Sequence, residues 1–393
     1  MKPPARSNTG PAGQYLDAAI ERVAGLEANL RSLVPLAEDA AARLTAGGNL
    51  YAVDDGGAFV SELCGRAGGM MMLRQLDDAA KAARGDVVLA GTSNLKPREQ
   101  EEQLRRLGGN GAMVVLFGSS ASPLRDLAAG FVDNSLPLGT APQIAQAGGP
   151  SICPASTVGN ITAAWTFTGE LVGACTRRGR MPTMYQSVFV PGSQVWIPRY
   201  AGQAFHDDFT IAPLDAGSIG GVYLAAIRHS LLGIRHTQLS LFLQAGGMCA
   251  DSLAAGHRVW YFCNGHHLGE QLGLPGDPGL MTPGNREKLA VGASDVFFWL
   301  GYYDLPEPEL AIANKARCRS VWICGARPVH PIPLGPDRVI IDPYWEFGDA
   351  VVAVPGYAIR ILPPSGVIQT MCLWMLNAEI AHSLHRKRDE AAT

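Results

Sequence analysis

Two adjacent histidines follow an apolar stretch in the second half of the chain and could supply acid–base chemistry. Residues 258–265 are apolar, aromatic and β-branched until they reach an Asn-Gly turn, a pattern typical of a buried parallel strand that ends in a loop. His266, His267 and Glu270 come next, where a helix is expected to begin. A helix N-terminus favours anions, and imidazole and carboxylate groups commonly move protons in enzymes. A tight turn with two solvated histidines would explain the same residues.

The stretch occurs twice along the chain. Residues 49–53 also have the pattern of a strand, and they end in the acidic loop 54–57. Further residues recur at the same spacing of 209 positions: Ala46-Gly47 and Ala255-Gly256, Gly56 and Gly265, Asp86 and Asp295, Asp133 and Asp342, Trp165 and Trp374, and Glu170 and Glu379. Self-similarity at one long spacing indicates a duplicated domain. We therefore predict two copies of one α/β unit, with loops that have diverged.

Within each copy, predicted helices and strands alternate. This order predicts a doubly wound parallel sheet with helices on both faces, a flavodoxin-like three-layer αβα fold. Loops that follow such strands gather at the carboxyl edge of the sheet, where ligands bind. The residues that we expect to contact a ligand are Asp54, Asp55, Gly56, Gly57, Thr92, Ser93, Asn94, Lys96, Ser119 and Ser120 in the first copy and Asn264, Gly265, Tyr302 and Tyr303 in the second.

The domain boundaries follow from the pattern of apolar residues and from composition. We predict a disordered lead over residues 1–13, a first domain over residues 14–180 and a second domain over residues 219–388, with a short tail at residues 389–393. The connector over residues 181–218 is long, aromatic and rich in proline and glycine, which suits a lid or a contact in a homo-oligomer.

Several motifs of the two copies resemble the sugar isomerase (SIS) domain. The first copy carries a helix that ends in Ala46-Gly47 and a third strand followed by Ser122-Pro123-Leu124, and the second copy has the loop Cys263-Asn264-Gly265. Two such domains in one chain resemble the isomerase half of glucosamine-6-phosphate synthase, and the Cys-Asn-Gly loop resembles phosphoheptose isomerases. The resemblance implies a carbohydrate-derivative ligand, an aldose–ketose isomerase or lyase activity, and clefts built from both domains.

The chain also departs from the pattern of that family. Its members hold a sugar phosphate with loop hydroxyls and backbone N–H groups, but the serine of the first loop falls on Ala58 in one copy and on His267 in the other. Phosphoheptose isomerases place a histidine on the last helix after an Ile-Gln pair. This chain has Cys372 at the corresponding position.

Aldose–ketose isomerisation requires a base that moves a proton between adjacent carbons and a second group that opens the sugar ring. Glu62 and Glu270 are the candidates for the base, and His266 or His267 for the ring opener. A favourable position in the first turn of a helix would explain each glutamate equally well. Glu170 and Glu379 occur in both copies, so a shared structural role is at least as plausible for them as catalysis.

A metal site and a second class of function stay open. His206, Asp207 and Asp208 in the connector could bind a divalent metal together with His266 or His267, although a polar turn explains them too. We assign no cofactor and no metal ligand. The altered loop hydroxyls also fit a catalytically silent protein that binds a sugar or sugar phosphate as a sensor or scaffold.

Charge and hydropathy exclude other partners. The 393 residues carry 32 Lys and Arg against 35 Asp and Glu, a net charge of −3, and no long basic run alternates with aromatic residues. Nucleic acid is therefore not expected as a partner. No apolar run approaches the roughly 18 residues that cross a bilayer, and the N-terminus lacks the features of a secretory signal. We expect a cytoplasmic protein that does not contact membranes.

Overall fold

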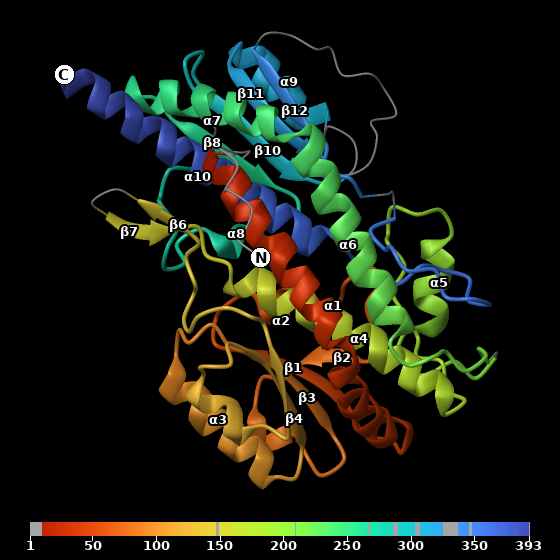
Figure 1. Cartoon of the computed structure of the whole chain (residues 1–393). Coiled ribbons are helices and arrows are strands. Elements are labelled where there is room, and N and C mark those ends of the chain that lie inside the picture. The colour runs from red at the N-terminus through yellow and green to blue at the C-terminus, as the bar shows by residue number, and fades with distance from the viewer. Residues whose placement is uncertain are drawn as a thin grey trace, which may run out of the picture.

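The computed structural model describes residues 10–146, 149–208, 210–265, 268–285, 290–302, 307–324, 337–345 and 348–392. Two sheets lie at opposite ends of the molecule, and long helices cross between them (Figure 1). The predicted fold class is confirmed: both sheets are parallel and five-stranded, and each has helices on both faces. None of the helices in the described ranges is both long and apolar enough to cross a membrane.

The two sheets have the same strand order. The first has the order β2-β1-β3-β4-β5 and comprises β1 (Leu50–Asp54), β2 (Leu73–Gln75), β3 (Val87–Gly91), β4 (Met113–Gly118) and β5 (Gly130–Asp133). The second has the order β9-β8-β10-β11-β12 and comprises β8 (Val259–Cys263), β9 (Thr282–Pro283), β10 (Val296–Gly301), β11 (Arg319–Cys324) and β12 (Arg338–Ile341). An additional antiparallel hairpin pairs β6 (Ile144–Gln146) with β7 (Gly149–Ile152).

The helices follow the duplication as well. The first copy contains α1 (Gly10–Thr45), α2 (Phe59–Leu63), α3 (Pro97–Gly109) and α4 (Ser156–Arg177). The second contains α6 (Ser218–Thr237), α7 (Leu239–Ala254), α8 (Leu268–Gln271), α9 (Glu307–Ala316) and α10 (Ser365–Ala392). The single helix α1 thus corresponds to the pair α6 and α7, and α5 (Ser193–Tyr200) belongs to the connector.

One repeated hydrogen-bond arrangement ties a turn to the first strand in each copy. The Asp86 carboxylate accepts hydrogen bonds from the backbone N–H groups of Asn49, at 2.8 Å, and Ala83, at 2.9 Å. Asp295 accepts the equivalent bonds from the N–H groups of Arg258, at 3.0 Å, and of Gly292, at 2.8 Å. These aspartates explain part of the repeat seen in the sequence, because buried backbone donors need an acceptor in both copies.

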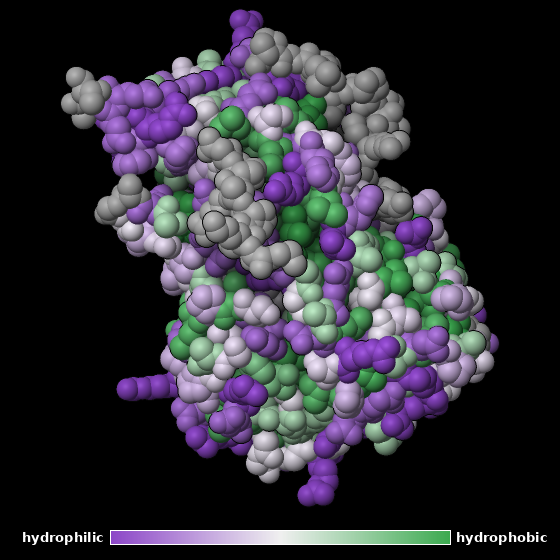
Figure 2. Space-filling model, in the orientation of Figure 1, coloured by the Kyte–Doolittle hydropathy of each residue, from purple (hydrophilic) through white to green (hydrophobic). Residues whose placement is uncertain are grey.

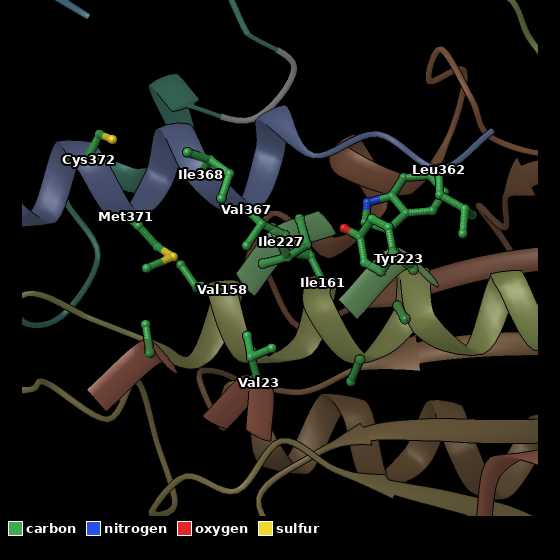
Figure 3. Close-up of a cluster of buried hydrophobic side chains, with 14 of the residues drawn as sticks. Val23, Val158, Ile161, Tyr223, Ile227, Leu362, Val367, Ile368, Met371 and Cys372 are labelled. Atoms are coloured by element: carbon green, nitrogen blue, oxygen red, sulfur yellow. The ribbon is translucent and has the colours of Figure 1, made fainter. Parts of the chain in front are cut away.

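The apolar core is shared between the copies. Side chains from α1, α4, α6 and α10 converge in one cluster between the two sheets (Figure 3). Trp165 of α4 and Trp374 of α10 are fully buried in it, each at the same position of its helix. Smaller clusters lie on the outer faces of the two sheets. Neither copy could bury its inner helices without the other, which agrees with the large apolar contact expected from a duplication.

Glu170 and Glu379 hold the two copies together in a reciprocal way. The carboxylate of Glu170, on α4, accepts hydrogen bonds from Gly217 N at 2.7 Å and from Gly220 N at 2.9 Å, at the beginning of α6. The carboxylate of Glu379, on α10, accepts one from Ala12 N at 2.9 Å, at the beginning of α1. Each copy therefore caps the first helix of the other copy, which is the shared structural role considered for these glutamates.

The predicted terminal segments differ in extent from the structure. Helix α1 begins at Gly10, inside the segment predicted to be a disordered lead, and the Glu379 carboxylate accepts a hydrogen bond from Ala12 N in its first turn. Helix α10 continues to Ala392 through most of the predicted tail. Residues 1–9 lie outside the part of the chain that the structure describes.

The connector packs against both copies. Met71 N donates to Thr183 O at 2.9 Å in the first copy, and the His206 imidazole contacts the Tyr357 hydroxyl, at 3.0 Å, in the second. Val188, Phe189 and Val195 are exposed around α5, and Figure 2 shows hydrophobic residues gathered on that side of the molecule. An oligomer contact at the connector remains a prediction.

The shared core predicts that the copies do not fold independently. Residues 10–180 and 210–392, expressed separately, should aggregate or self-associate, because each would expose the inner faces of its long helices. Size-exclusion chromatography and thermal unfolding of each half, with the full chain as the control, test this. A half that is monomeric and unfolds cooperatively would contradict it.

The reciprocal caps predict a measurable loss of stability. Glu170→Ala should lower the free energy of unfolding by about 2–3 kcal/mol, because two backbone donors lose a charged acceptor. Glu101→Ala is the control, since Glu101 is exposed and pairs with exposed Arg105, and it should change the value by less than about 0.5 kcal/mol. If urea unfolding shows the same loss of unfolding free energy for Glu170→Ala and Glu101→Ala, the cap does not stabilise the fold.

Candidate functional site

The two ligand loops predicted in the first copy lie together at the carboxyl edge of its sheet. Asp54 ends β1, and its carboxylate accepts hydrogen bonds from Gly56 N at 3.0 Å and from Val60 N at 2.8 Å. This carboxylate holds the first turn of α2. The neighbouring carboxylate of Asp55 points the other way, into the loop that follows β3.

Asp55 fills the loop that was expected to hold a ligand. Both oxygens of its carboxylate lie 3.1 Å from Ser93 N, and Oδ2 also accepts from Leu95 N at 2.8 Å and from the Thr92 hydroxyl at 3.4 Å. Asp55, Thr92 and Ser93 are buried, and Asn94 between the donors has a positive φ of 56°. Burial raises the pKa of Asp55, and the hydrogen bonds from Leu95 and Ser93 oppose that shift.

The remaining loop residues of the first copy have separate positions. A Cβ on Gly57 would lie 2.8 Å from Ser93 Oγ, so the two loops approach closely only because this residue is glycine. Lys96 is exposed just before α3. Ser119 is buried and donates to Leu136 O, while Ser120 lines a pocket of 270 Å³ beside α1, away from Asp55. Ser119 and Ser120 therefore lie apart from the first loop.

A buried charged cluster lies between the two copies and includes one of the predicted catalytic residues. Glu62 follows the first loop on α2, and its carboxylate lies 3.3 Å from the guanidinium of Arg66. Arg66 also donates to Asp349, at 3.1 Å, and to the hydroxyls of Tyr302 and Ser365, which belong to the second copy. We name this set of five residues the Arg66 cluster. All its members are buried.

The position of Glu62 depends on both copies. Trp165 Nε1 donates to Glu62 Oε1 at 3.2 Å from α4. On the other side, a Cβ on Gly366 would overlap the Glu62 carboxylate, so the first turn of α10 is in direct contact with it. Glu62 was predicted from its place after the first loop. Arg66, Asp349 and Ser365 were missed. The spacing of four between Glu62 and Arg66 was a signal for an ion pair, although α2 ends at Leu63 and Arg66 follows it after a turn.

Burial in the cluster raises the pKa values of both of its carboxyl groups. Burial raises the pKa of Asp349 to about 6, against the opposing effect of Arg66. Burial likewise raises the pKa of Glu62, again opposed by Arg66. One guanidinium cannot neutralise two buried carboxylates, so the pair favours carrying a proton at a higher pH than free carboxyl groups do. Strongly shifted groups of this kind concentrate at functional sites.

Glu270, the other predicted base, faces the first copy from α8. Its carboxyl group interacts with the Ser61 hydroxyl and with the charge of Asp54, and burial raises its pKa. Glu270 itself is more exposed than Glu62. Beside it, a pocket of 580 Å³ is lined at the carboxyl edge of the second sheet by Cys263, Gly269, Leu272, Asn285 and Trp299, among others.

Part of the predicted site falls outside the described residues. His266, His267 and Tyr303 are in this group, so their roles stay predictions. Asn264 is exposed, and its N–H donates to Leu300 O at 3.0 Å. Gly265 packs against Leu268.

The connector residues that were considered as metal ligands have other contacts. His206 Nδ1 lies 3.4 Å from the Asp208 carboxylate, and the other ring nitrogen contacts Tyr357. Asp208 also pairs with Arg199 at 2.6 Å and accepts from the Tyr200 hydroxyl at 2.8 Å. Within the described ranges, no group of three His, Cys, Asp or Glu side chains is placed to hold a metal ion.

Solved structures share this fold over nearly their whole length. The C-terminal domain of glucosamine-fructose-6-phosphate aminotransferase from Francisella tularensis matches with a TM-score of 0.53 and 9% identity, covering 98% of this chain and 98% of that chain. A proposed phosphosugar isomerase from Clostridium difficile 630 matches with a TM-score of 0.53 and 8% identity, over 96% of this chain and 93% of that chain. A proposed sugar-binding protein from Salmonella typhimurium LT2 matches with a TM-score of 0.50 and 10% identity, over 94% and 99% of the two chains.

Such low identities show a common fold and leave the activity to be argued from the residues of this chain. No family model matches the sequence, and no curated protein matches it either.

The raised pKa of Asp349 predicts a specific pH dependence. Asp349 is easier to protonate in the folded state than in the unfolded state, so its contribution to stability is present below pH 4 and is lost as pH rises through about 6. The free energy of unfolding of the wild type should therefore fall by about 2 kcal/mol relative to Asp349→Asn between pH 4 and pH 7. Urea unfolding at each pH measures this difference. Asp77→Asn replaces an exposed aspartate, and its unfolding free energy should differ from that of the wild type by a similar amount at each pH. A difference between the wild type and Asp349→Asn that stays constant from pH 4 to pH 7 would contradict the prediction.

Proposed function

We propose that this chain, which has the tandem SIS fold of the structures it resembles, binds a carbohydrate derivative between its two copies and transfers a proton on it. The observation that carries the proposal is the Arg66 cluster, in which a predicted catalytic glutamate is buried beside a second carboxyl group and an arginine. A structural ion pair would need only one carboxylate. Burial raises the pKa of both carboxyl groups, and enzymes tune general acids and bases by burial in the same way.

The elements that contribute to the cluster support this assignment. Glu62 follows the first loop of one copy, Tyr302 follows β10 of the other, and Ser365 begins α10. Loops at the carboxyl edges of two sheets therefore meet there, as expected for a ligand site in open parallel sheets. Two of the similar structures bear names of proteins that act on or bind sugars or their phosphates, which fits a carbohydrate-derivative ligand.

Aldose–ketose isomerisation uses these groups as follows. The Glu62 carboxylate takes the proton from the carbon next to the carbonyl group of the open-chain sugar, and an enediolate forms with its negative charge on the former carbonyl oxygen. The proton of the neighbouring hydroxyl moves to that oxygen. Glu62 then returns its proton to the former carbonyl carbon, and the neighbouring oxygen becomes the new carbonyl oxygen. Arg66 and Tyr302 would donate hydrogen bonds to the two oxygens during the transfer.

Access to Glu62 requires a local rearrangement. The carboxylate has no exposed surface, since Trp165, Arg66 and the first turn of α10 enclose it. A ligand reaches it only when the contact between α2 and α10 opens. Glu270 is exposed and interacts with Ser61 of α2, so it offers the ligand a first polar contact beside this junction.

Solvent exchange tests the proposal directly. The wild type, incubated in D₂O with a panel of aldoses, ketoses and their phosphates, should introduce deuterium next to the carbonyl group of its substrate, as followed by proton NMR. Glu62→Gln should slow this exchange by about 10²–10⁴-fold, which is the usual contribution of a general base. Glu170→Gln is the matched control, because it also changes a buried glutamate but one that only caps a helix. The proposal fails if no member of the panel exchanges, or if Glu62→Gln and Glu170→Gln exchange equally.

A silent carbohydrate-binding protein is the second candidate. The observation in its favour is that Asp55 fills the loop after β3, where a ligand group was expected. Thermal stabilisation by a sugar or sugar phosphate, with no deuterium exchange into that same compound, would support this alternative over an isomerase.

A further inference from the structure

Arg22 of α1 is a buried arginine at the contact between the two copies. Its side chain is only 8% exposed. Nη1 donates to the amide oxygen of Gln143 at 3.0 Å, which is a neutral acceptor, and Nη2 has no hydrogen-bond partner among the described residues. A buried charge is normally paired, because burial removes the hydration that stabilises it in water. Arg22 has a hydrogen bond but lacks a counter-charge.

The acidic groups nearest to Arg22 do not supply that charge. Burial raises the pKa of the Tyr15 phenol, so this group is neutral at neutral pH. Glu21 is exposed to solvent, and Asp17, on the same helix, pairs with Arg235 of α6 at 2.8 Å. Within the described ranges, no carboxylate forms an ion pair with Arg22. The chain therefore buries this guanidinium without neutralising it.

A small cavity adjoins Arg22 in the shared core. It has a volume of 10 Å³, counted as the space open to the centre of a water molecule, which is room for one water molecule or one monatomic ion. Three helices, α1, α4 and α10, supply most of its wall. Figure 3 shows four of the apolar wall residues: Val23, Val158, Val367 and Met371.

The other polar side chains of the wall already have partners. The Asn134 amide donates to Asn160 Oδ1 at 2.7 Å, and the Thr162 hydroxyl donates to Val158 O at 2.6 Å. Among the side chains that line the cavity in the described part of the chain, Nη2 of Arg22 is thus the donor left for an occupant. The occupant would meet one cationic donor and a largely apolar wall.

The second copy shows that packing alone does not call for an arginine here. Leu231 of α6 lies 209 residues after Arg22, the spacing of the duplication, and it is fully buried in the same core. An apolar side chain therefore serves at the equivalent position. Position 22 instead carries a charge whose burial is unfavourable unless something neutralises it.

We propose that Arg22 and the cavity beside it bind a monatomic anion such as chloride. The ion accepts a hydrogen bond from Nη2 and neutralises the guanidinium, whereas a water molecule could accept the same bond but would bring no charge. It would hold α10 against α1 and α4 at Val367, next to Gly366, whose position encloses the Glu62 carboxylate. The site does not depend on the proton transfer assigned to Glu62, because it needs no substrate.

Chloride should stabilise the protein through Arg22. The melting temperature of the wild type is measured by circular dichroism in sodium chloride and in sodium gluconate at equal ionic strength, since gluconate is too large for the cavity. It should rise by about 2 °C for each tenfold increase in chloride above the dissociation constant, beyond any rise in gluconate. Arg22→Met removes the charge but keeps a long, unbranched side chain, and this chloride-specific rise should disappear.

Arg177→Met is the matched control. Arg177 is also partly buried and also has an Nη2 group without a hydrogen-bond partner among the described residues, but Glu38 supplies its counter-charge at 2.6 Å. This variant should keep the chloride-specific rise of the wild type. The proposal is overturned if the wild type shows no such rise, if Arg22→Met retains it, or if Arg177→Met loses it as well.

Bromide locates the ion in the wild type and decides the outcome if Arg22→Met does not fold. Crystals grown in sodium bromide should give an anomalous scattering peak in the cavity, within hydrogen-bond distance of Arg22 Nη2. A cavity that is empty or holds water in these crystals would overturn the proposal. Neither measurement uses an isomerase assay, so failure of the anion site and failure of the role proposed for Glu62 are distinguishable.

Discussion

The structure depends on one constraint: the long helices α1, α4, α6 and α10 must be buried against one another between two sheets. Each copy supplies two of these helices, so neither copy has a complete core. The caps from Glu170 and Glu379 follow from the same arrangement, since a helix that begins inside the core needs acceptors for its first N–H groups. The duplicated chain therefore behaves as one folding unit built from two domains of one fold.

A shared core leaves the loops free to differ. Packing is required of both copies, so Trp165 and Trp374, and the aspartates at positions 86 and 295, occur in both. The carboxyl edges of the sheets carry no such requirement. One copy has placed Asp55 in its own loop, and the other contributes Tyr302 to the Arg66 cluster. Copies with one fold thus present two chemically different edges.

The Arg66 cluster stands out because burial of charge is costly. An arginine and two carboxyl groups lose their hydration there, and the ion pairs offset that loss only in part. An apolar contact would hold two domains together at lower cost. The presence of a buried, charged junction beside loops at the carboxyl edges of the two sheets is the physical reason for proposing that it has a function.

The sequence by itself determined the duplication, the α/β class and the resemblance to SIS domains, all confirmed at the level of fold, because these depend on periodic patterns that each copy carries locally. It also marked Glu62 and the loop at Asp55 as places of interest. Only the tertiary structure decided their partners, because Arg66 meets Asp349 across 283 positions and Asp55 meets Leu95 across 40. Contacts between segments so distant in the chain leave no periodic signal in one sequence. The arrangement of strands within one sheet brings Asp55 to Leu95, and the packing of the two copies brings Arg66 to Asp349.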